Sequence, residues 1–133
     1  MDKNILNISN IETYLNSIID GVVSKNTFFT TIPDKSIVDS SDWKDMVLIT
    51  MPDGISDLEA FGQGAVYVIL YARPLESGKK NVAQMSILEV SLNEVIASAK
   101  NEHYTISRND VYADYDEDIN WHCNVVELIL KVF

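Results

Sequence analysis

Three aspartates, Asp114, Asp116 and Asp118, alternate along one stretch of the sequence and offer the carboxylate oxygens that calcium prefers. A calcium-binding EF-hand loop also needs a glycine at its sixth position and a bidentate glutamate at its twelfth. Those two positions hold Ile119 and Val125, so the pattern fails. We interpret the stretch as a solvated acidic turn, because runs of acidic residues usually face water. A cation site of another kind stays open as an alternative.

The two histidines and the single cysteine are the other candidates for metal binding or catalysis. His122 and Cys123 are adjacent in a predicted strand, so their side chains point to opposite faces and do not form a nucleophile and base pair. His103 precedes another predicted strand and could approach His122 if the two strands pair, with Asp116 or Glu127 completing a metal site. This pair lacks the short, fixed spacing usual for metal-binding histidines. We therefore predict no catalytic residue, no metal site and no cofactor.

The composition limits the classes of function that suit this chain. Its 133 residues fit one domain of ordinary size, and 47% of them are hydrophobic, so we expect a single domain over residues 1–133. The formal net charge is −10, and the longest basic run is the pair Lys79-Lys80. Affinity for nucleic acid depends on Lys and Arg that displace counterions, so sequence-specific nucleic-acid binding is not expected. The sequence shows no signal-peptide pattern and no apolar run of the ~20 residues that span a bilayer, so we expect no membrane association.

Hydrophobic periodicity predicts two core-facing helices, at residues 9–24 and 81–100. The first starts with Ser9 and Glu12, which have the spacing of a capping box. Residues 34–42 are predicted to form a polar loop, a turn is expected at Asn109-Asp110, and residues 55–64 stay unassigned. The segments predicted as strands are residues 27–32, 44–51, 65–72, 104–108, 111–115 and 120–133.

This order of elements predicts an α+β fold, with a mainly antiparallel sheet and two amphipathic helices packed on one face. Aromatic residues in predicted loops are candidates for an interface, because buried aromatic side chains often anchor protein contacts. Acidic residues suit docking to a surface of opposite charge. The candidate interface residues are Trp43, Phe61, Asp114, Asp116, Asp118 and Trp121.

An amphipathic first helix, a turn with the sequence MPDGI, the apolar strand AVYVILYARP, a second helix and a long final strand follow one another along the chain. In this order of elements the chain resembles the tail-terminator and tail-completion (neck) proteins of tailed bacteriophages, whose members have a sheet flanked by two helices. The resemblance covers most of the chain and rests on element order, so it transfers no functional residue.

The resemblance implies that copies assemble into a ring, commonly with sixfold symmetry, at the junction of tail tube and head. The expected partners are further copies of the chain, tail-tube protein and head-connector protein. The protein is then a component of the virion, or is cytoplasmic in the host cell before assembly. An acidic lumen would let DNA pass without binding, because like charges repel.

Three hypotheses for function therefore stand. The first is a structural assembly protein that forms a ring. The second is a small-molecule or peptide-binding module, with a pocket between helices and sheet near Tyr67, Tyr71 and Trp121. The third is a metal-dependent enzyme that uses His103, His122 and the acidic stretch.

Overall fold

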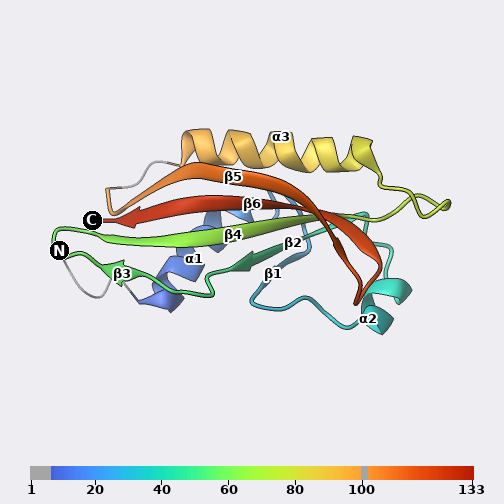
Figure 1. Cartoon of the computed structure of the whole chain (residues 1–133), viewed down its shortest axis with the longest axis horizontal. Helices are drawn as coiled ribbons and strands as arrows, with labels where there is room; N and C mark the ends of the chain where they lie inside the picture. The colour runs from blue at the N-terminus through green and yellow to red at the C-terminus, as the bar shows by residue number, and fades with distance from the viewer. Residues whose placement is uncertain (1–6, 100–101) are drawn as a thin grey trace.

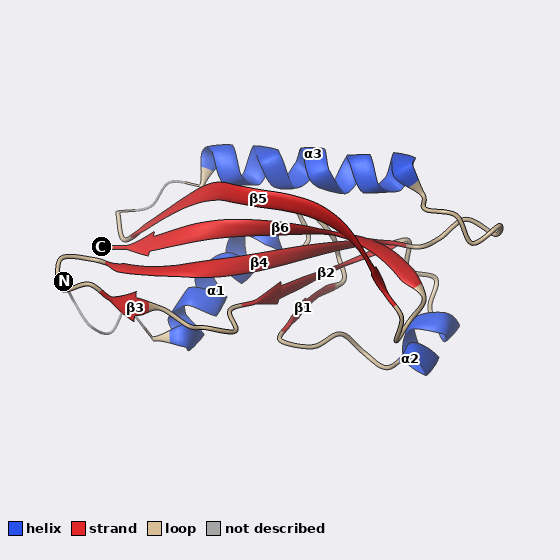
Figure 2. Cartoon of the chain, viewed as in Figure 1, coloured by secondary structure: helices blue, strands red, loops and turns tan. Residues whose placement is uncertain are grey.

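The computed structural model of this chain describes residues 7–99 and 102–133. The helices and strands are α1 (Ile8–Ile19), β1 (Thr27–Phe29), α2 (Lys35–Ser40), β2 (Asp45–Thr50), β3 (Ser56–Asp57), β4 (Gly62–Ala72), α3 (Val82–Ser98), β5 (Tyr104–Asp116) and β6 (Trp121–Val132). The strands form one six-stranded sheet in the order β1-β2-β4-β6-β5, with β3 paired to β4. All pairs are antiparallel except β1 with β2, so the predicted α+β fold is confirmed for the described residues (Figure 2).

The two long helices, α1 and α3, pack on the same face of the sheet, as the sequence predicts (Figure 1). Alternate side chains of β4 and β6 point toward them, because successive residues of a strand face opposite sides. The resulting core is almost fully buried and includes Ile11, Leu15, Val66, Val68, Leu70, Met85, Leu88, Leu92, Val126, Leu128 and Leu130. Within the described residues no helix combines the length and apolar character needed to cross a bilayer.

Helix α1 begins and ends earlier than predicted. Asn7 is its N-cap, and the Asn7 side-chain oxygen accepts a hydrogen bond from the backbone N–H of Ser9 at 2.9 Å. The predicted capping box of Ser9 and Glu12 is therefore wrong, since Ser9 already lies in the first turn. The helix ends before Gly21, whose φ of +74° turns the chain and leaves Val22 59% exposed. The second predicted helix is confirmed as α3, which begins at Val82 and ends at Ser98, and residue 100 lies outside the described residues.

Two segments without a predicted element contain regular structure. The predicted loop at residues 34–42 includes helix α2, and residues 55–64 include β3 and the start of β4. Helix α2 was missed because Val38 alone of its residues is buried, so it carries no apolar stripe. The predicted strand at residues 27–32 ends at Phe29, because Thr30 adopts a φ of +69°.

Strand β5 is longer than predicted. The turn expected at Asn109-Asp110 is wrong, because β5 continues past these residues and pairs with β6 from Tyr104 to Asp116. The register shifts between Arg108 and Asp110, which leaves Asn109 as the extra residue of a β-bulge. The predicted strand at residues 120–133 is confirmed as β6.

A second, smaller core lies on the face of the sheet that α1 and α3 leave uncovered. Tyr67, Tyr71 and Trp121 lie on this face, so a pocket lined by them is not between the long helices and the sheet. Helix α2 covers one end of this face through Val38. The buried residues of this core are Val38, Met46, Leu48, Tyr71, Ile119, Trp121 and Cys123.

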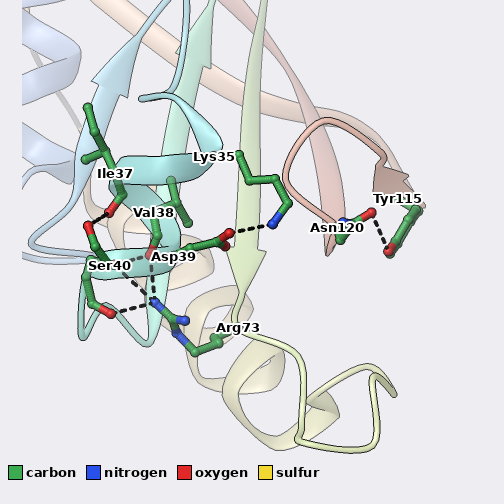
Figure 3. A network of polar contacts seen from close by, with 9 residues as sticks. Lys35, Ile37, Val38, Asp39, Ser40, Arg73, Tyr115 and Asn120 are labelled. Carbon is green, nitrogen blue, oxygen red and sulfur yellow. Dashed lines mark hydrogen bonds and ion pairs between the residues drawn. The ribbon is translucent and has the colours of Figure 1, made fainter.

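Arg73, the residue after β4, contacts helix α2 and the segment that follows it. Arg73 donates from Nη2 to the carbonyl oxygen of Val38 at 3.1 Å (Figure 3). It also donates from Nη2 to the carbonyl oxygen of Ser41 at 3.2 Å and from Nε to that of Trp43 at 2.6 Å. Its guanidinium carbon also lies 4.9 Å from the centre of the Trp121 ring. The last carbonyls of a helix have few partners within it, and Arg73 adds a donor to the Val38 carbonyl, which also accepts hydrogen bonds from Ser41.

Candidate functional site

Two adjoining hollows open on the second face of the sheet, where the turn between β5 and β6 approaches α2. Their volumes are about 650 Å³ and about 400 Å³. Tyr71, Asp116 and Asp118 line both hollows, which therefore share a wall, and we call the two together the hairpin groove. Leu48 in the larger hollow and Ile69 in the smaller one contribute apolar surface to its floor.

The rim of the hairpin groove is acidic. Residues 114–118 supply two exposed aspartates, an exposed glutamate and the half-buried Asp116. Lys35 lines the larger hollow, but its ammonium group forms an ion pair with Asp39 one turn later in α2 (Figure 3). A groove with an apolar floor and an acidic rim suits a ligand with an apolar side chain beside a basic one.

Tyr71 connects the floor of the groove to its rim. Its hydroxyl donates a hydrogen bond to Asp116 Oδ2 at 3.0 Å. Burial, and after it the Asp116 carboxylate, raises the pKa of Tyr71 well above its usual value. The hydroxyl therefore stays protonated and fixes the position of Asp116, and it is unsuited to act as a base.

Cys123 lies in the wall of the smaller hollow and is a buried, free thiol. Burial, followed by the charges of Asp114 and Asp116, raises the pKa of Cys123 to about 12. The thiolate is the reactive form of cysteine, and this environment disfavours it. The geometry therefore gives no support to nucleophilic chemistry at the groove.

The candidate interface residues do not form one patch. Asp114, Asp116 and Asp118 lie together at the hairpin groove. Trp121 is 3% exposed in the second core, so it offers almost no surface for contact with another molecule.

The two loop aromatics lie near opposite ends of β4. Trp43 is half-buried against Phe28, with ring centres 5.7 Å apart. Phe61 is half-buried against Phe133, with ring centres 5.9 Å apart, and Lys131 Nζ lies 5.5 Å from the centre of its ring. Both therefore keep part of their surface available, but at separate sites.

The two histidines do not meet. His122 pairs with Tyr115 near the turn of the β5–β6 hairpin, whereas the carbonyl of His103 accepts a hydrogen bond from the backbone N–H of Phe133 at the opposite end. In residues 7–99 and 102–133, no group of three or more His, Cys, Asp or Glu side chains is arranged to hold a metal ion.

The outward face of α3 is a feature that the sequence prediction missed. Val82, Ile87 and Val90 are 66%, 62% and 54% exposed on the side of the helix that points away from the sheet. Val22 is also exposed and lies near Val90, because the hydroxyl of the next residue, Ser91, donates to the Val22 carbonyl at 3.1 Å. We call these four residues, Val22, Val82, Ile87 and Val90, the outer patch. The sequence does contain a sign of this patch. Ile87 and Val90 fall outside the apolar stripe of α3, on the face of an amphipathic helix where polar residues are expected.

The loop between β4 and α3, residues 74–80, projects past the end of α3, at the right of the view (Figure 1). It folds on itself through hydrogen bonds from Leu75 N to Lys79 O at 3.0 Å and from Gly78 N to Leu75 O at 2.8 Å. Gly78 supplies the φ of +83° that this turn requires. Leu75 is 49% exposed, and Lys79 is also exposed. We call this segment the β4–α3 loop.

Comparison of the sequence with known protein families gives no match, and comparison with curated proteins also gives none.

Proposed function

We propose that this protein is a structural subunit that assembles with copies of itself into a ring. The observation that carries the proposal is the outer patch on α3. A helix that is apolar on both sides is usually buried on both sides, and the described part of the chain covers only one side of α3. A second copy of the chain covers the other side.

The distribution of charge supports a second copy as the occupant of the outer patch. The chain carries a formal net charge of −10, so two copies repel each other over most of their surfaces. The exposed residues of α3 include one charged side chain, Glu94, so the repulsion between two such faces is weak. Burying the outer patch contributes roughly 1 kcal/mol per side chain, since each is already partly buried.

The specific form we propose is a tail-terminator or neck subunit at the head–tail junction of a phage-like particle. The resemblance in element order is the basis for this choice. A mainly antiparallel sheet that carries two long helices on one face supports it. The acidic composition also suits a ring through which DNA passes, because the lumen then repels phosphate.

The test of the proposed function is the native mass of the chain in solution over a concentration series, by light scattering behind a sizing column. We expect a discrete closed oligomer, seen as rings by electron microscopy. A chain that stays monomeric at high concentration, and also in the presence of tail-tube protein, contradicts the proposal.

The hairpin groove favours one other candidate function, a binding module for a small molecule or peptide. Its larger hollow, of about 650 Å³, lies in the usual size range of ligand pockets. Binding of a small ligand by a chain that stays monomeric would favour this function over assembly.

A further inference from the structure

We infer that the hairpin groove receives the β4–α3 loop of a neighbouring copy, with Leu75 on the apolar floor and Lys79 against the acidic rim. The inference rests on the proposed function and deepens it, because it names the contact that joins one copy to the next. A contact between two different surfaces of the same chain is heterologous, and heterologous contacts generate rings when the rotation between copies closes.

The two surfaces are complementary in charge. The rim of the groove carries the carboxylates of residues 114–118, and its lysine, Lys35, is paired with Asp39. The β4–α3 loop contains Glu76 and the lysine pair at residues 79 and 80, and this pair is the longest basic run of an acidic chain. The loop is therefore a locally basic segment that suits an acidic rim.

The two surfaces are also complementary in polarity. Leu75 projects an apolar side chain next to Lys79, since the two residues are joined by the hydrogen bond that closes the turn. The groove places apolar surface from Leu48 and Ile69 next to the carboxylates of Asp116 and Asp118. Leu75 can therefore contact the apolar floor of the groove while Lys79 lies against the carboxylates of its rim.

The loop is held in the shape in which we expect it to bind. Lys80 Nζ donates to Asn124 Oδ1 at 2.6 Å, and Asn124 Nδ2 donates to Glu89 Oε1 at 2.6 Å. His122 Nε2 lies 3.3 Å from the carbonyl oxygen of Gly78. These contacts tie the loop to β6 and α3 and leave its tip exposed, so little conformational entropy is lost on binding.

The β4–α3 loop leads directly into Val82 at the start of α3, so the loop lies next to one end of the outer patch. A neighbour that receives the loop in its groove therefore lies close to the Val82 end of the outer patch. The groove contact fixes the register between copies, and the outer patch adds apolar area to the same interface.

The first experiment is a charge exchange, read out as native mass by light scattering. We expect Lys79→Glu and Asp118→Lys each to weaken assembly by about tenfold or more, because each places like charges across the contact. The chain that carries both substitutions restores an opposite pair, so its assembly should recover. The matched controls are Lys25→Glu and Asp53→Lys, which change the net charge equally at exposed positions outside the groove, the loop and the outer patch.

The second experiment maps the contact in the unmodified protein. Isotopically heavy and light chains are mixed, allowed to assemble, and treated with a carbodiimide, which joins a lysine amine to a nearby carboxylate. We expect cross-linked peptides of mixed label that join Lys79 to Asp114, Asp116, Glu117 or Asp118.

The outcomes separate this inference from the proposed function. An oligomer whose mass is unaffected by Lys79→Glu and Asp118→Lys, or whose Lys79 cross-links join only peptides of one label, overturns the inference and leaves a self-assembling subunit. A chain that is monomeric under all conditions overturns both. Saturable binding of a short peptide that alternates lysine and leucine, by a groove that no neighbouring loop occupies, identifies a different partner and also overturns the inference.

Discussion

The edge strand β5 and the outward face of α3 both run along the surface of the molecule, and they differ in how they are protected from association. Among the described residues β5 pairs with β6 alone, so its outer edge presents unpaired backbone groups. A bulge at Asn109 and the charges of Arg108, Asp110 and Asp114 interrupt that edge. Natural sheets use such bulges and charges to prevent pairing between edges.

The outward face of α3 has no comparable protection. Its apolar residues Ile87 and Val90 are more than half exposed, and Glu94 is the charged residue among its exposed positions. An exposed apolar surface that lacks charges and bulges against association is therefore a candidate for contact with another molecule. The outward face of α3 is therefore a better candidate for an assembly surface than the edge of β5.

The largest expected effect separates the two surfaces directly. We expect Val90→Asp to reduce the native mass to that of a single chain at every accessible concentration, because it buries an unpaired charge in the contact. Val111→Asp is the matched control, since Val111 is an exposed valine on β5. Light scattering measures both. Equal loss of mass in the two variants would contradict the assignment of the interface to α3.

The second prediction concerns how stability depends on pH. Strand β5 carries Asp114 and Asp116, whose charges raise the pKa of the Cys123 thiol, whereas α3 contributes no such group. The pKa of the Cys123 thiol is raised from 9.0 to about 12 in the folded chain. Above the unfolded pKa the unfolded state binds fewer protons than the folded state, so stability falls as the pH rises through this window.

We therefore expect Cys123→Ala to lose less stability between pH 9 and pH 12 than the parent chain, by roughly 2–4 kcal/mol. Urea unfolding at a series of pH values measures this difference. Asp114→Asn should lower the pKa of Cys123, because it removes one of the charges that raise it. The rate of thiol alkylation against pH gives that pKa, and an unchanged profile would show that Asp114 does not act on the thiol.

A smaller effect is expected when the protection of β5 is removed. Deletion of Asn109 together with Asp110→Val and Asp114→Val straightens the edge and removes two charges, so we expect aggregation to become severalfold faster. Turbidity over time measures the rate. Asp42→Val with Asp53→Val is the matched control, because it makes the same exchange of exposed aspartate for valine away from β5. If the control aggregates equally fast, general hydrophobicity and not the edge is the cause.

The smallest expected effect concerns the link between the two elements. Arg108 Nη1 donates to Asn93 Oδ1 at 2.9 Å and thereby joins β5 to α3 at an exposed site. We expect Arg108→Met to change the free energy of unfolding by less than about 1 kcal/mol, since exposed polar contacts contribute little. A larger loss in urea unfolding would show that the link between β5 and α3 is a structural requirement.

Most of the fold could be predicted from the sequence, because α1, α3, β4 and β6 carry strong periodic patterns. Those patterns record which face of an element is buried, and burial supplies most of the stabilising free energy. The bulge at Asn109 could not be predicted, because the same residues suit a tight turn. β5 continues past Asn109 because residues on both sides of it pair with β6, and this pairing is not visible in the local sequence.

The candidate site was predictable in part. The aspartates of residues 114–118 were singled out from their spacing, and they do line the groove. The position of α2 on the second face was not predictable, because it depends on Arg73, more than thirty residues away in sequence from Val38. Trp121 was predicted as an interface residue and is buried, since a tryptophan in a strand gives no signal of which face a later helix will cover.

The strand order also has a consequence for how the chain folds as it is made. β6 lies between β4 and β5, so β5 cannot pair until residues 121–132 have left the ribosome. Until then β4 lacks its neighbour on one side, and the apolar residues of α1 and α3 lack much of the surface they cover. Folding of the sheet is therefore expected to be late and cooperative, and the incomplete chain exposes the surfaces through which it is most prone to aggregate.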